Sequence, residues 1–394
     1  MKIFYVNQFA GEDAKLFEEL VSSEIKKNNE IWFLGPTNSE YLGDKNNEKF
    51  VKKIWSNNDY VLKIFNFVKK EKPDIVFFNF EIRNFGSLKA AIRFPLLLLL
   101  LKSKTKTAVT MHQIFINKNN GKWEFLEEHD LVKIPLFLLK IFIKLFVKAN
   151  CNLTNKTIVL SKSAKQGLVE FFHVQKEKII VSNLAMDNKI IPENKRNENE
   201  ILQEFKGKKI ILCFGAIAPR KGLEYAILSF NKIKDKMSEH VLVIAGSEIE
   251  HYKNYKDELI NIINKHDLKN RVIFTGNISI EKVNTLFRIS DMVIYSNLPY
   301  SGGSYAIFHA IHHKKPIIAT KIDAFTDVLS KEMALFVNTK NSEEISNAIL
   351  KLYLEPGLKD ELIHAIAKVS NKYSWHYVAL EHMRIFQSIK DNVK

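Results

Sequence analysis

The stretch from Gly302-Gly303-Ser304-Tyr305 to Lys315-Pro316-Ile317-Ile318-Ala319-Thr320 places a glycine-containing loop before a helical pattern and then an apolar strand. Upstream, the apolar run from Asp291 to Ser296 has the length of a short buried strand. The glycines therefore follow the carboxyl end of a strand, where parallel sheets bind ligands. A helix that starts there would direct free amide groups toward an anion, so the pattern predicts a ligand-binding βα unit.

A second unit of this kind lies earlier in the chain. An apolar strand from Lys209 to Phe214 is followed by a loop from Gly215 to Gly222 and a helical pattern from Leu223 to Lys234. Within the loop, Arg220 can form a fork to phosphate oxygens and Lys221 can act as a point charge. The two glycines allow the backbone to approach a diphosphate closely. Taken alone, the loop is more consistent with a solvated basic turn than with a ligand site.

Length and composition narrow the possible classes of protein. The 394 residues exceed one typical domain, and the 46% hydrophobic content is enough for two cores. The net charge of +15 indicates an anionic partner, either a nucleotide, a nucleic acid or a membrane lipid, unless it only reflects a genome rich in lysine codons. Two cysteines and a start without a signal peptide predict a cytoplasmic protein.

The first half alternates strand and helix signals, which predicts a parallel sheet covered by helices and an α/β fold class. The polar stretch from Asn188 to Glu200 has the composition of an interdomain linker. We therefore expect domains at residues 1–187 and 207–372, a linker at 188–206 and a final helical segment at 373–394. The expected elements of the first half are strands at 3–6, 30–34, 74–79 and 107–112 and helices at 13–27 and 51–70.

The second half resembles the nucleotide-sugar half of a GT-B glycosyltransferase of the family-4, or glycosyltransferase group 1, type. Order and spacing carry the resemblance across Phe214 to Gly222, Val241 to Gly246, Arg271 to Gly276, Ile289 to Ile294 and Lys315 to Thr320. It implies two Rossmann-like domains facing each other across a cleft. Residues 1–187 would then bind the acceptor, residues 207–372 would bind the nucleotide sugar, and the last helix would cross back to the N-terminal domain.

The chain departs from this family at the donor site. Members usually carry two glutamates separated by seven residues, and Ser301 and His309 occupy those positions. Ala216 stands where an arginine is common, so Arg220 would substitute from the other end of the turn. The expected donor-binding residues are Gly215, Gly222, Tyr300, Ser301, Gly302, Gly303, Ser304, Tyr305 and His309. A zinc site at His309, His312 and His313 fits helical spacing but lacks a carboxylate or cysteine, and the family needs neither metal nor cofactor.

Further candidates lie in the first half. His112 follows a predicted strand and resembles the histidine that family members place near the donor sugar, so we group it with Arg220 and Lys221 as catalytic. A lone histidine is more often structural. On the acceptor side we expect Asn7, Gln8 and Gly11 of the first loop, with Glu81.

Two apolar stretches raise the question of membrane contact. Val132 to Lys148 carries lysines mostly along one helical stripe and large apolar side chains over much of the rest, which favours an anionic membrane surface over a plain core helix. Phe94 to Leu101 is too short to span a bilayer and favours a core helix.

These observations and the resemblance together predict a metal-independent, retaining glycosyltransferase peripheral to the inner face of the cell membrane. It would move a sugar from a nucleotide-diphosphate donor to a lipid-linked or surface-polysaccharide acceptor. The departures at Ser301 and His309 leave a non-catalytic subunit of a glycosylation complex as the alternative. A nucleic-acid-binding protein is disfavoured, because no zinc module, RNP-like motif or arginine-rich helix is present.

Overall fold

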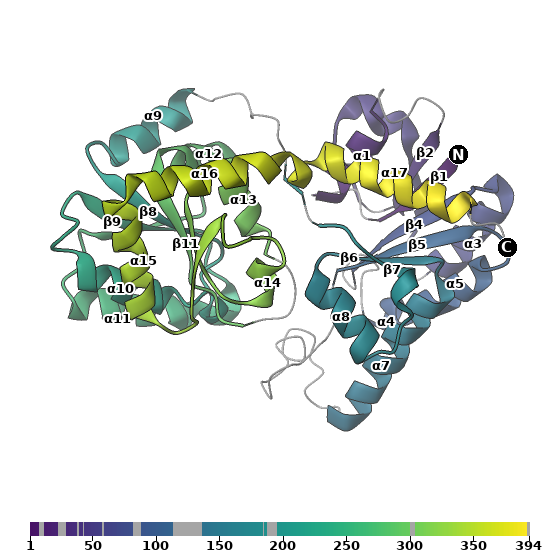
Figure 1. Ribbon diagram of the computed structural model, residues 1–394. Coiled ribbons are helices and arrows are strands. Elements are labelled where there is room, and N and C mark those ends of the chain that lie inside the picture. The colour runs from purple at the N-terminus through teal and green to yellow at the C-terminus, as the bar shows by residue number, and fades with distance from the viewer. Residues whose placement is uncertain are drawn as a thin grey trace. The chain divides into compact units, whose positions relative to one another are not determined.

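The computed structural model describes residues 1–7, 12–22, 29–37, 39–41, 43–56, 59–81, 88–112, 136–183, 185–186, 195–299 and 304–391. The chain divides into two compact units (Figure 1). Unit 1 comprises Met1–Asn183 together with Trp375–Lys394, and unit 2 comprises Leu184–Ser374. The final helix therefore belongs to the N-terminal unit.

Unit 1 contains a seven-stranded parallel sheet with the strand order β3-β2-β1-β4-β5-β6-β7. The strands are β1 Lys2–Val6, β2 Glu30–Pro36, β3 Val51–Trp55, β4 Ile75–Phe80, β5 Lys106–Met111, β6 Lys156–Val159 and β7 Ile179–Val181. The helices are α1 Glu12–Leu20, α3 Tyr60–Glu71, α4 Leu88–Ala91, α5 Phe94–Leu101, α7 Leu136–Leu153, α8 Lys162–Glu170 and α17 Trp375–Asp391, with 3-10 turns at η1 Lys45–Phe50 and η4 Lys176–Lys178.

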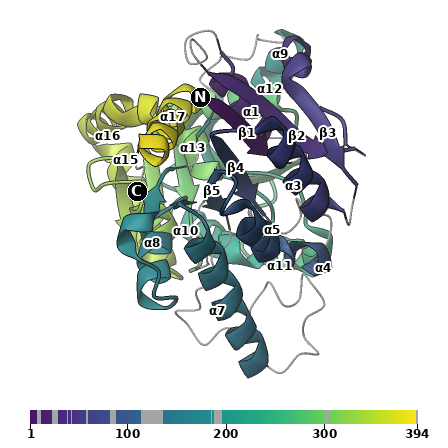
Figure 2. The same ribbon diagram turned by 90° about the vertical axis from the view of Figure 1, so that its right-hand side faces the viewer.

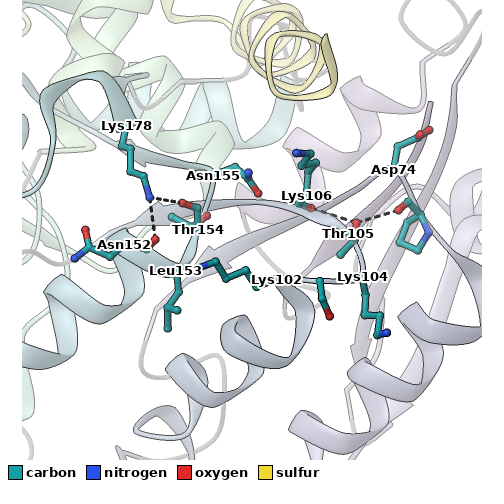
Figure 3. Close-up of a pocket in the computed structure, with 12 residues that line it drawn as sticks. Asp74, Lys102, Lys104, Thr105, Lys106, Asn152, Leu153, Thr154, Asn155 and Lys178 are labelled. Atoms are coloured by element: carbon teal, nitrogen blue, oxygen red, sulfur yellow. Dashed lines mark hydrogen bonds between the residues drawn. The ribbon is translucent and has the colours of Figure 1, made fainter. Parts of the chain in front are cut away.

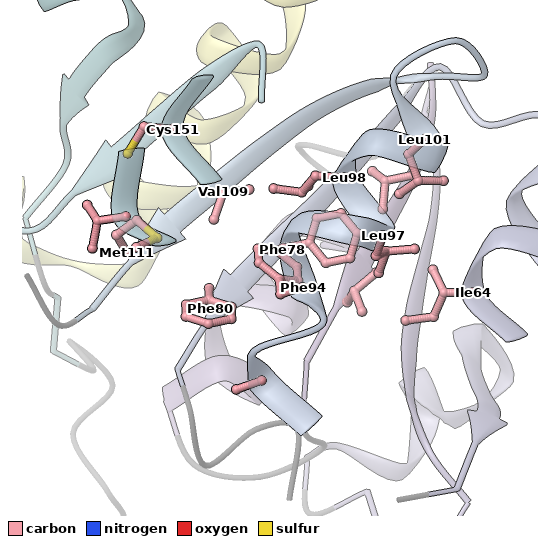
Figure 4. Packing of buried hydrophobic residues seen from close by; sticks show 14 of the residues in the cluster. Ile64, Phe78, Phe80, Phe94, Leu97, Leu98, Leu101, Val109, Met111 and Cys151 are labelled. Carbon is pink, nitrogen blue, oxygen red and sulfur yellow. The ribbon is translucent and has the colours of Figure 1, made fainter. Parts of the chain in front are cut away.

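Successive side chains of the central strands point to opposite faces of this sheet, so each face has its own hydrophobic core. In β4, Phe78 packs edge-on against Phe94 of α5, with ring centroids 5.1 Å apart, in the core shown in Figure 4. Phe77, the residue before Phe78, points to the other face of the sheet. Its ring stacks on Tyr5, and its centroid lies 5.2 Å from that of Phe386 in α17. Helix α17 thus completes a core that the first 183 residues leave open.

One segment differs from the sequence prediction. We expected a helix over residues 51–70, but Val51–Trp55 forms the parallel edge strand β3 and the helix begins only at Tyr60. The β-branched residues and tryptophan of this run favour an extended chain. Its two lysines suit an edge strand, where charged side chains discourage pairing with other molecules.

Unit 2 contains a six-stranded parallel sheet with the order β10-β9-β8-β11-β12-β13. The strands are β8 Lys209–Phe214, β9 His240–Ala245, β10 Val272–Gly276, β11 Ser290–Tyr295, β12 Ile317–Thr320 and β13 Ala334–Val337. The helices are α9 Lys195–Glu204, α10 Leu223–Ile233, α11 Lys253–Lys265, α12 Ile280–Ile289, α13 Ala306–His312, α14 Asp323–Thr326, α15 Ser342–Leu354 and α16 Pro356–Ser370, with 3-10 turns at η5 Pro219–Lys221, η6 Glu250–Tyr252 and η7 Asn371–Tyr373.

The predicted linker at 188–206 is partly wrong, because residues 195–204 form α9 within unit 2. Ile201 and Phe205 are buried in the same core as Phe287 of α12. Burial of Ile201 on the helix and of Phe205 directly after it thus anchors to unit 2 a segment whose overall composition is that of a polar linker.

Both sheets have the doubly wound order, in which the first strand of each unit lies between its second and fourth strands. The switch point lies between β1 and β4 in unit 1 and between β8 and β11 in unit 2, and ligands bind at the carboxyl ends of such strands. The expected α/β fold class is confirmed.

The packing of α17 yields a stability prediction. Phe386 is fully buried, whereas Phe137 of α7 is 63% exposed in the same unit. Because Phe386→Ala leaves a cavity in the core, we expect it to destabilise unit 1 by about 3–5 kcal/mol. Phe137→Ala should change stability by less than about 0.5 kcal/mol. Denaturant unfolding checks both, and similar stabilities for the two variants would contradict the assignment of α17 to this core.

Candidate functional site

The end of β8 is built for close backbone approach. Gly215 has φ +130°, and its amide donates to the carbonyl of Ala245 at the end of β9, with 2.9 Å between nitrogen and oxygen. A Cβ placed on the neighbouring Gly246 would lie 2.1 Å from the carbonyl oxygen of Gly215. Any side chain at Gly246 would therefore push the two strand ends apart.

Lys221 occupies the space that Gly215 leaves open. Its Nζ lies 3.0 Å from the position that a Cβ on Gly215 would take. The side chain is 7% exposed, and burial, followed by the charge of Arg220, lowers the pKa of Lys221 to about 8. Within the part of the chain that the structure describes, no carboxylate pairs with this ammonium group. A buried cation without a counter-ion is suited to an anionic ligand, which would offset the cost of burying its charge.

The loop that carries Lys221 is held through its backbone. Gly222 adopts the left-handed conformation with φ +58°, and a Cβ there would lie 2.4 Å from the carbonyl oxygen of Ser296. Ser296 Oγ donates to the carbonyl of Lys221 at 2.9 Å, and the amide of Leu298 donates to the carbonyl of Arg220 at 2.8 Å. The chain after β11 thus fixes the backbone of both cationic residues.

At the start of α10, the backbone amide of Leu223 is already hydrogen-bonded within the protein and is not available to a ligand. The amide of Leu223 donates to the hydroxyl oxygen of Tyr255 at 3.0 Å, and that hydroxyl in turn donates to Glu224. Because this amide is bonded within the protein, an anion at the loop would depend mainly on the side chains of Arg220 and Lys221.

Helix α13 begins beside the same loop. It starts at Ala306, whose Cβ lies 3.9 Å from the position of a Cβ on Gly215, and Ser304 just before it is buried. The structure thus brings Gly215, Lys221 and the start of α13 together. The predicted site residues Tyr300, Ser301, Gly302 and Gly303 lie outside the described residues.

His309 packs against three aromatic side chains. Its ring stacks on Phe287, with ring centroids 5.4 Å apart. It contacts Phe214 and Tyr305 edge-on, with centroid distances of 4.8 and 5.6 Å. Burial, followed by the charge of His312, lowers the pKa of His309 to about 4, so the imidazole is neutral near pH 7. Its Nδ1 is fully buried and has no hydrogen-bond partner among the described residues. The residue therefore combines packing with a neutral polar edge, unlike the carboxylate usual in the family.

His313, the last member of the histidine cluster, also packs on Phe287, with ring centroids 5.4 Å apart, and its Nε2 lies 3.2 Å from Oδ1 of Asn284. Burial and the nearby His312 lower the pKa of His313 to about 3. Among the described residues no group of three or more histidine, cysteine or acidic side chains is arranged to hold a metal ion.

The predicted residues of unit 1 follow three adjacent parallel strands. His112 lies just after β5, and its Nε2 is 2.6 Å from Oδ1 of Asn79 in β4. With that oxygen as acceptor, Nε2 carries the ring proton and Nδ1 is the basic nitrogen. Asn7 is buried directly after β1, and Glu81 is half-buried after β4. Gln8 and Gly11 lie outside the described residues.

Sequence reasoning missed three polar residues at these strand ends. Asn79 orients His112, Ser296 holds the loop of Lys221, and Asn297 beside it is buried, with its carbonyl accepting from Thr320 Oγ1 at 2.7 Å. The available signal was a polar side chain at the end of an otherwise apolar strand run. That signal marks Asn79 within Ile75–Phe80 and Ser296 after Ser290–Tyr295.

Residues 194–369, nearly the whole of unit 2, match the family described as glycosyl transferases group 1. The matched region, which is nearly all of unit 2, belongs to the glycosyltransferase group 1 family. The resemblance that the motifs indicated is thereby confirmed, and the GT-B fold is shown by the solved structures that the chain matches.

Three similar proteins illustrate the match. An uncharacterized glycosyltransferase of Methanocaldococcus jannaschii is 23% identical over 59% of this chain and 60% of its own length. The phosphatidyl-myo-inositol mannosyltransferase of Mycobacterium leprae is 21% identical over 46% of this chain and 47% of its own length. The structure of HepE from Anabaena in complex with UDP has a TM-score of 0.72 and 15% identity, covering 98% of this chain and all of that one. The chain thus spans about half to three fifths of these two curated relatives.

The lowered pKa of Lys221 yields a pH prediction. The charged form of Lys221 is the one that would bind a diphosphate, and with a pKa of about 8 in the free protein most of that form is lost by pH 9. The affinity for a nucleoside diphosphate, measured by calorimetry with UDP and GDP in turn, should fall about tenfold from pH 7 to pH 9. In Lys221→Arg the guanidinium stays charged, so the fall should disappear. An equal fall in both proteins would show that another group controls binding.

Proposed function

We propose that this protein is a metal-independent, retaining glycosyltransferase that transfers a hexosyl group from a nucleotide-diphosphate sugar. The observation that carries the proposal is the buried ammonium of Lys221, which lies against Gly215 at the switch point of unit 2 and has no carboxylate partner among the described residues. Two cations and a glycine turn at the ends of β8 and β11 suit a diphosphate. The UDP bound by the structurally similar HepE supports the same class of ligand.

The chemistry follows from the charge that develops on the leaving group. Transfer breaks the bond between the anomeric carbon and a phosphate oxygen and forms a bond to an acceptor hydroxyl, whose proton passes to the departing phosphate. Negative charge therefore grows on the diphosphate in the transition state, where Arg220 and Lys221 stabilise it without reorganising. Same-face attack, which gives retention, is the feature that the family resemblance implies.

In unit 1, we assign the sugar-contacting role to His112. Its Nε2 is hydrogen-bonded to Asn79, which holds the ring at the carboxyl end of β5, where a sugar hydroxyl could contact it. Asn79 acts as a positioning residue because it fixes both the ring and its tautomer.

For the acceptor we propose a lipid-linked or surface-polysaccharide saccharide at the inner face of the cell membrane. One relative's name includes a phosphatidyl-inositol acceptor. On this chain, α7 buries Leu139, Ile143 and Val147 and exposes other large apolar side chains on its remaining surface. The exposed ones are Phe137, Leu138, Ile141, Phe142 and Leu145.

Helix α7 has the properties of an interfacial helix rather than a membrane span. Lys140 and Lys144 are exposed between the apolar residues, where they can reach anionic headgroups. The first part of α7 extends beyond the neighbouring helices of unit 1 in both views (Figures 1 and 2). Within the described residues, no helix is both long enough and apolar enough to cross a bilayer. The leucine run of α5 mainly supports the core, since Leu97, Leu98 and Leu101 are fully buried.

Turnover of nucleotide sugars tests the proposed activity. The assay would measure release of the nucleoside diphosphate from UDP-, GDP- and ADP-hexoses with saccharide acceptors. Because His112 acts on the sugar, we expect His112→Ala to lower kcat about 100-fold while changing nucleotide affinity less than about twofold. Lys221→Ala should weaken nucleotide affinity at least about tenfold.

The controls are His364→Ala and Lys265→Ala, two exposed side chains of unit 2 that should change neither quantity. Nucleotide binding without turnover of any donor would favour the non-catalytic subunit, the alternative that His309 in place of a carboxylate suggests. Absence of both would contradict the proposal.

Vesicle co-sedimentation tests the membrane surface on α7. Phe137 and Leu145 are each 63% exposed, so the double variant Phe137→Ala/Leu145→Ala removes apolar area without disturbing the core. We expect its affinity for phosphatidylglycerol vesicles to fall at least about tenfold. Leu62→Ala/Phe171→Ala, which changes two other exposed apolar side chains of unit 1, should bind as the unaltered protein does. Equal loss in both variants, or no vesicle binding at all, would contradict a role for α7.

A further inference from the structure

A basic pocket of about 650 Å³ lies in unit 1, away from the residues discussed so far. It is lined by the chain that leads into β4, β5 and β6 and by Lys178, which precedes β7. These are the amino ends of the strands, so the pocket lies on the edge of the sheet opposite to Asn7, Glu81 and His112. Its volume is within the range of small-molecule sites.

Four lysines line the pocket: Lys102, Lys104, Lys106 and Lys178 (Figure 3). Its one acidic residue, Asp74, is already used, because it pairs with Lys390 at 3.3 Å and accepts the amide of Lys2 at 2.8 Å. Among the described residues, no carboxylate forms an ion pair with any of the four lysines. The pocket therefore carries a surplus of positive charge.

Part of this surplus has a structural explanation. Helices α5 and α7 both end at the pocket, and Lys178 Nζ donates to the carbonyls of Asn152 and Thr154, at 2.8 and 3.1 Å. Each helix end is equivalent to roughly half a negative charge. The two ends together offset about one of the four lysines, which leaves a net charge of about +3.

The lysines also repel one another. Lys102 and Lys178 approach the end of α7 from two different loops (Figure 3). Burial, followed by the charges of Lys102 and Lys156, lowers the pKa of Lys178. An anion between these groups would relieve that repulsion and would replace water around the ammonium groups.

We propose that this pocket binds a phosphate-bearing ligand that has no aromatic base. Lysines are point charges that suit phosphate oxygens, and Ser103, Asn152 and Asn155 supply neutral polar groups beside them. None of the described lining residues is aromatic, so nothing offers a stacking surface for a nucleobase. Inorganic pyrophosphate, a phosphorylated carbohydrate and the headgroup of an anionic lipid share the required chemistry.

Lysine acetylation of the full chain, read residue by residue by mass spectrometry, tests the site. Inorganic pyrophosphate at constant ionic strength is the first probe, and phosphatidylglycerol vesicles, compared with phosphatidylcholine vesicles, are the second. We expect at least one probe to slow acetylation of Lys102 and Lys104 about threefold or more, because a bound anion shields the amines. Lys63 and Lys69, which are exposed on α3, should be unaffected. Lys221 reports the nucleotide site separately.

Protection by pyrophosphate identifies a site for free phosphates, and protection only by phosphatidylglycerol vesicles identifies a lipid headgroup. Equal slowing at Lys63 and Lys69, or no protection in either arm, would overturn the proposal. In Lys102→Gln/Lys104→Gln, protection of Lys106 should disappear while that of Lys221 stays. Lys63→Gln/Lys69→Gln, which removes the same charge, should keep both, and loss of Lys106 protection in this control would equally overturn the assignment.

Discussion

The ammonium group of Lys221, buried against Gly215 without a counter-ion in the described structure, is the constraint around which unit 2 is organised. Burying an unpaired cation costs several kcal/mol, so an anionic ligand that compensated the charge would stabilise this arrangement. The surrounding chain keeps Lys221 in this place through the left-handed Gly222 and the hydrogen bond from Ser296 Oγ. The backbone is thus rigid before any ligand arrives, which favours binding to charge that develops during a reaction.

The two sheets make this arrangement possible in the same way. Their central strands are mostly apolar on both faces and therefore buried, and the polar residues of the candidate sites lie at or near the ends of the strands. In unit 1 the ends of β1, β4 and β5 carry Asn7, Asn79 and His112, and in unit 2 the end of β8 carries Gly215. Doubly wound order brings such ends together, which is why one fold offers a ligand site in each unit.

The sequence allowed the glycine and lysine loop to be predicted because its features are local. A strand, a glycine turn and two adjacent cations lie within fourteen consecutive residues, 209–222. Asn79 could not be found in this way, since it meets His112 from 33 residues away and only the register of β4 against β5 unites them. The packing of His309 likewise depends on Phe287 and Phe214, which come from other elements. Helix α9 was not predicted because its composition is polar. It belongs to unit 2 because Ile201 is buried in the core, a tertiary contact that outweighs this composition.

Amide hydrogen exchange of the full chain, with and without saturating UDP or GDP, tests the central claim most directly. If the loop of Lys221 holds the diphosphate, exchange should slow in residues 215–223 and 296–299, and it should slow clearly less there in Lys221→Ala at the same nucleotide concentration. Slowed exchange confined to unit 1, or equal protection of the loop in Lys221→Ala, would contradict the account.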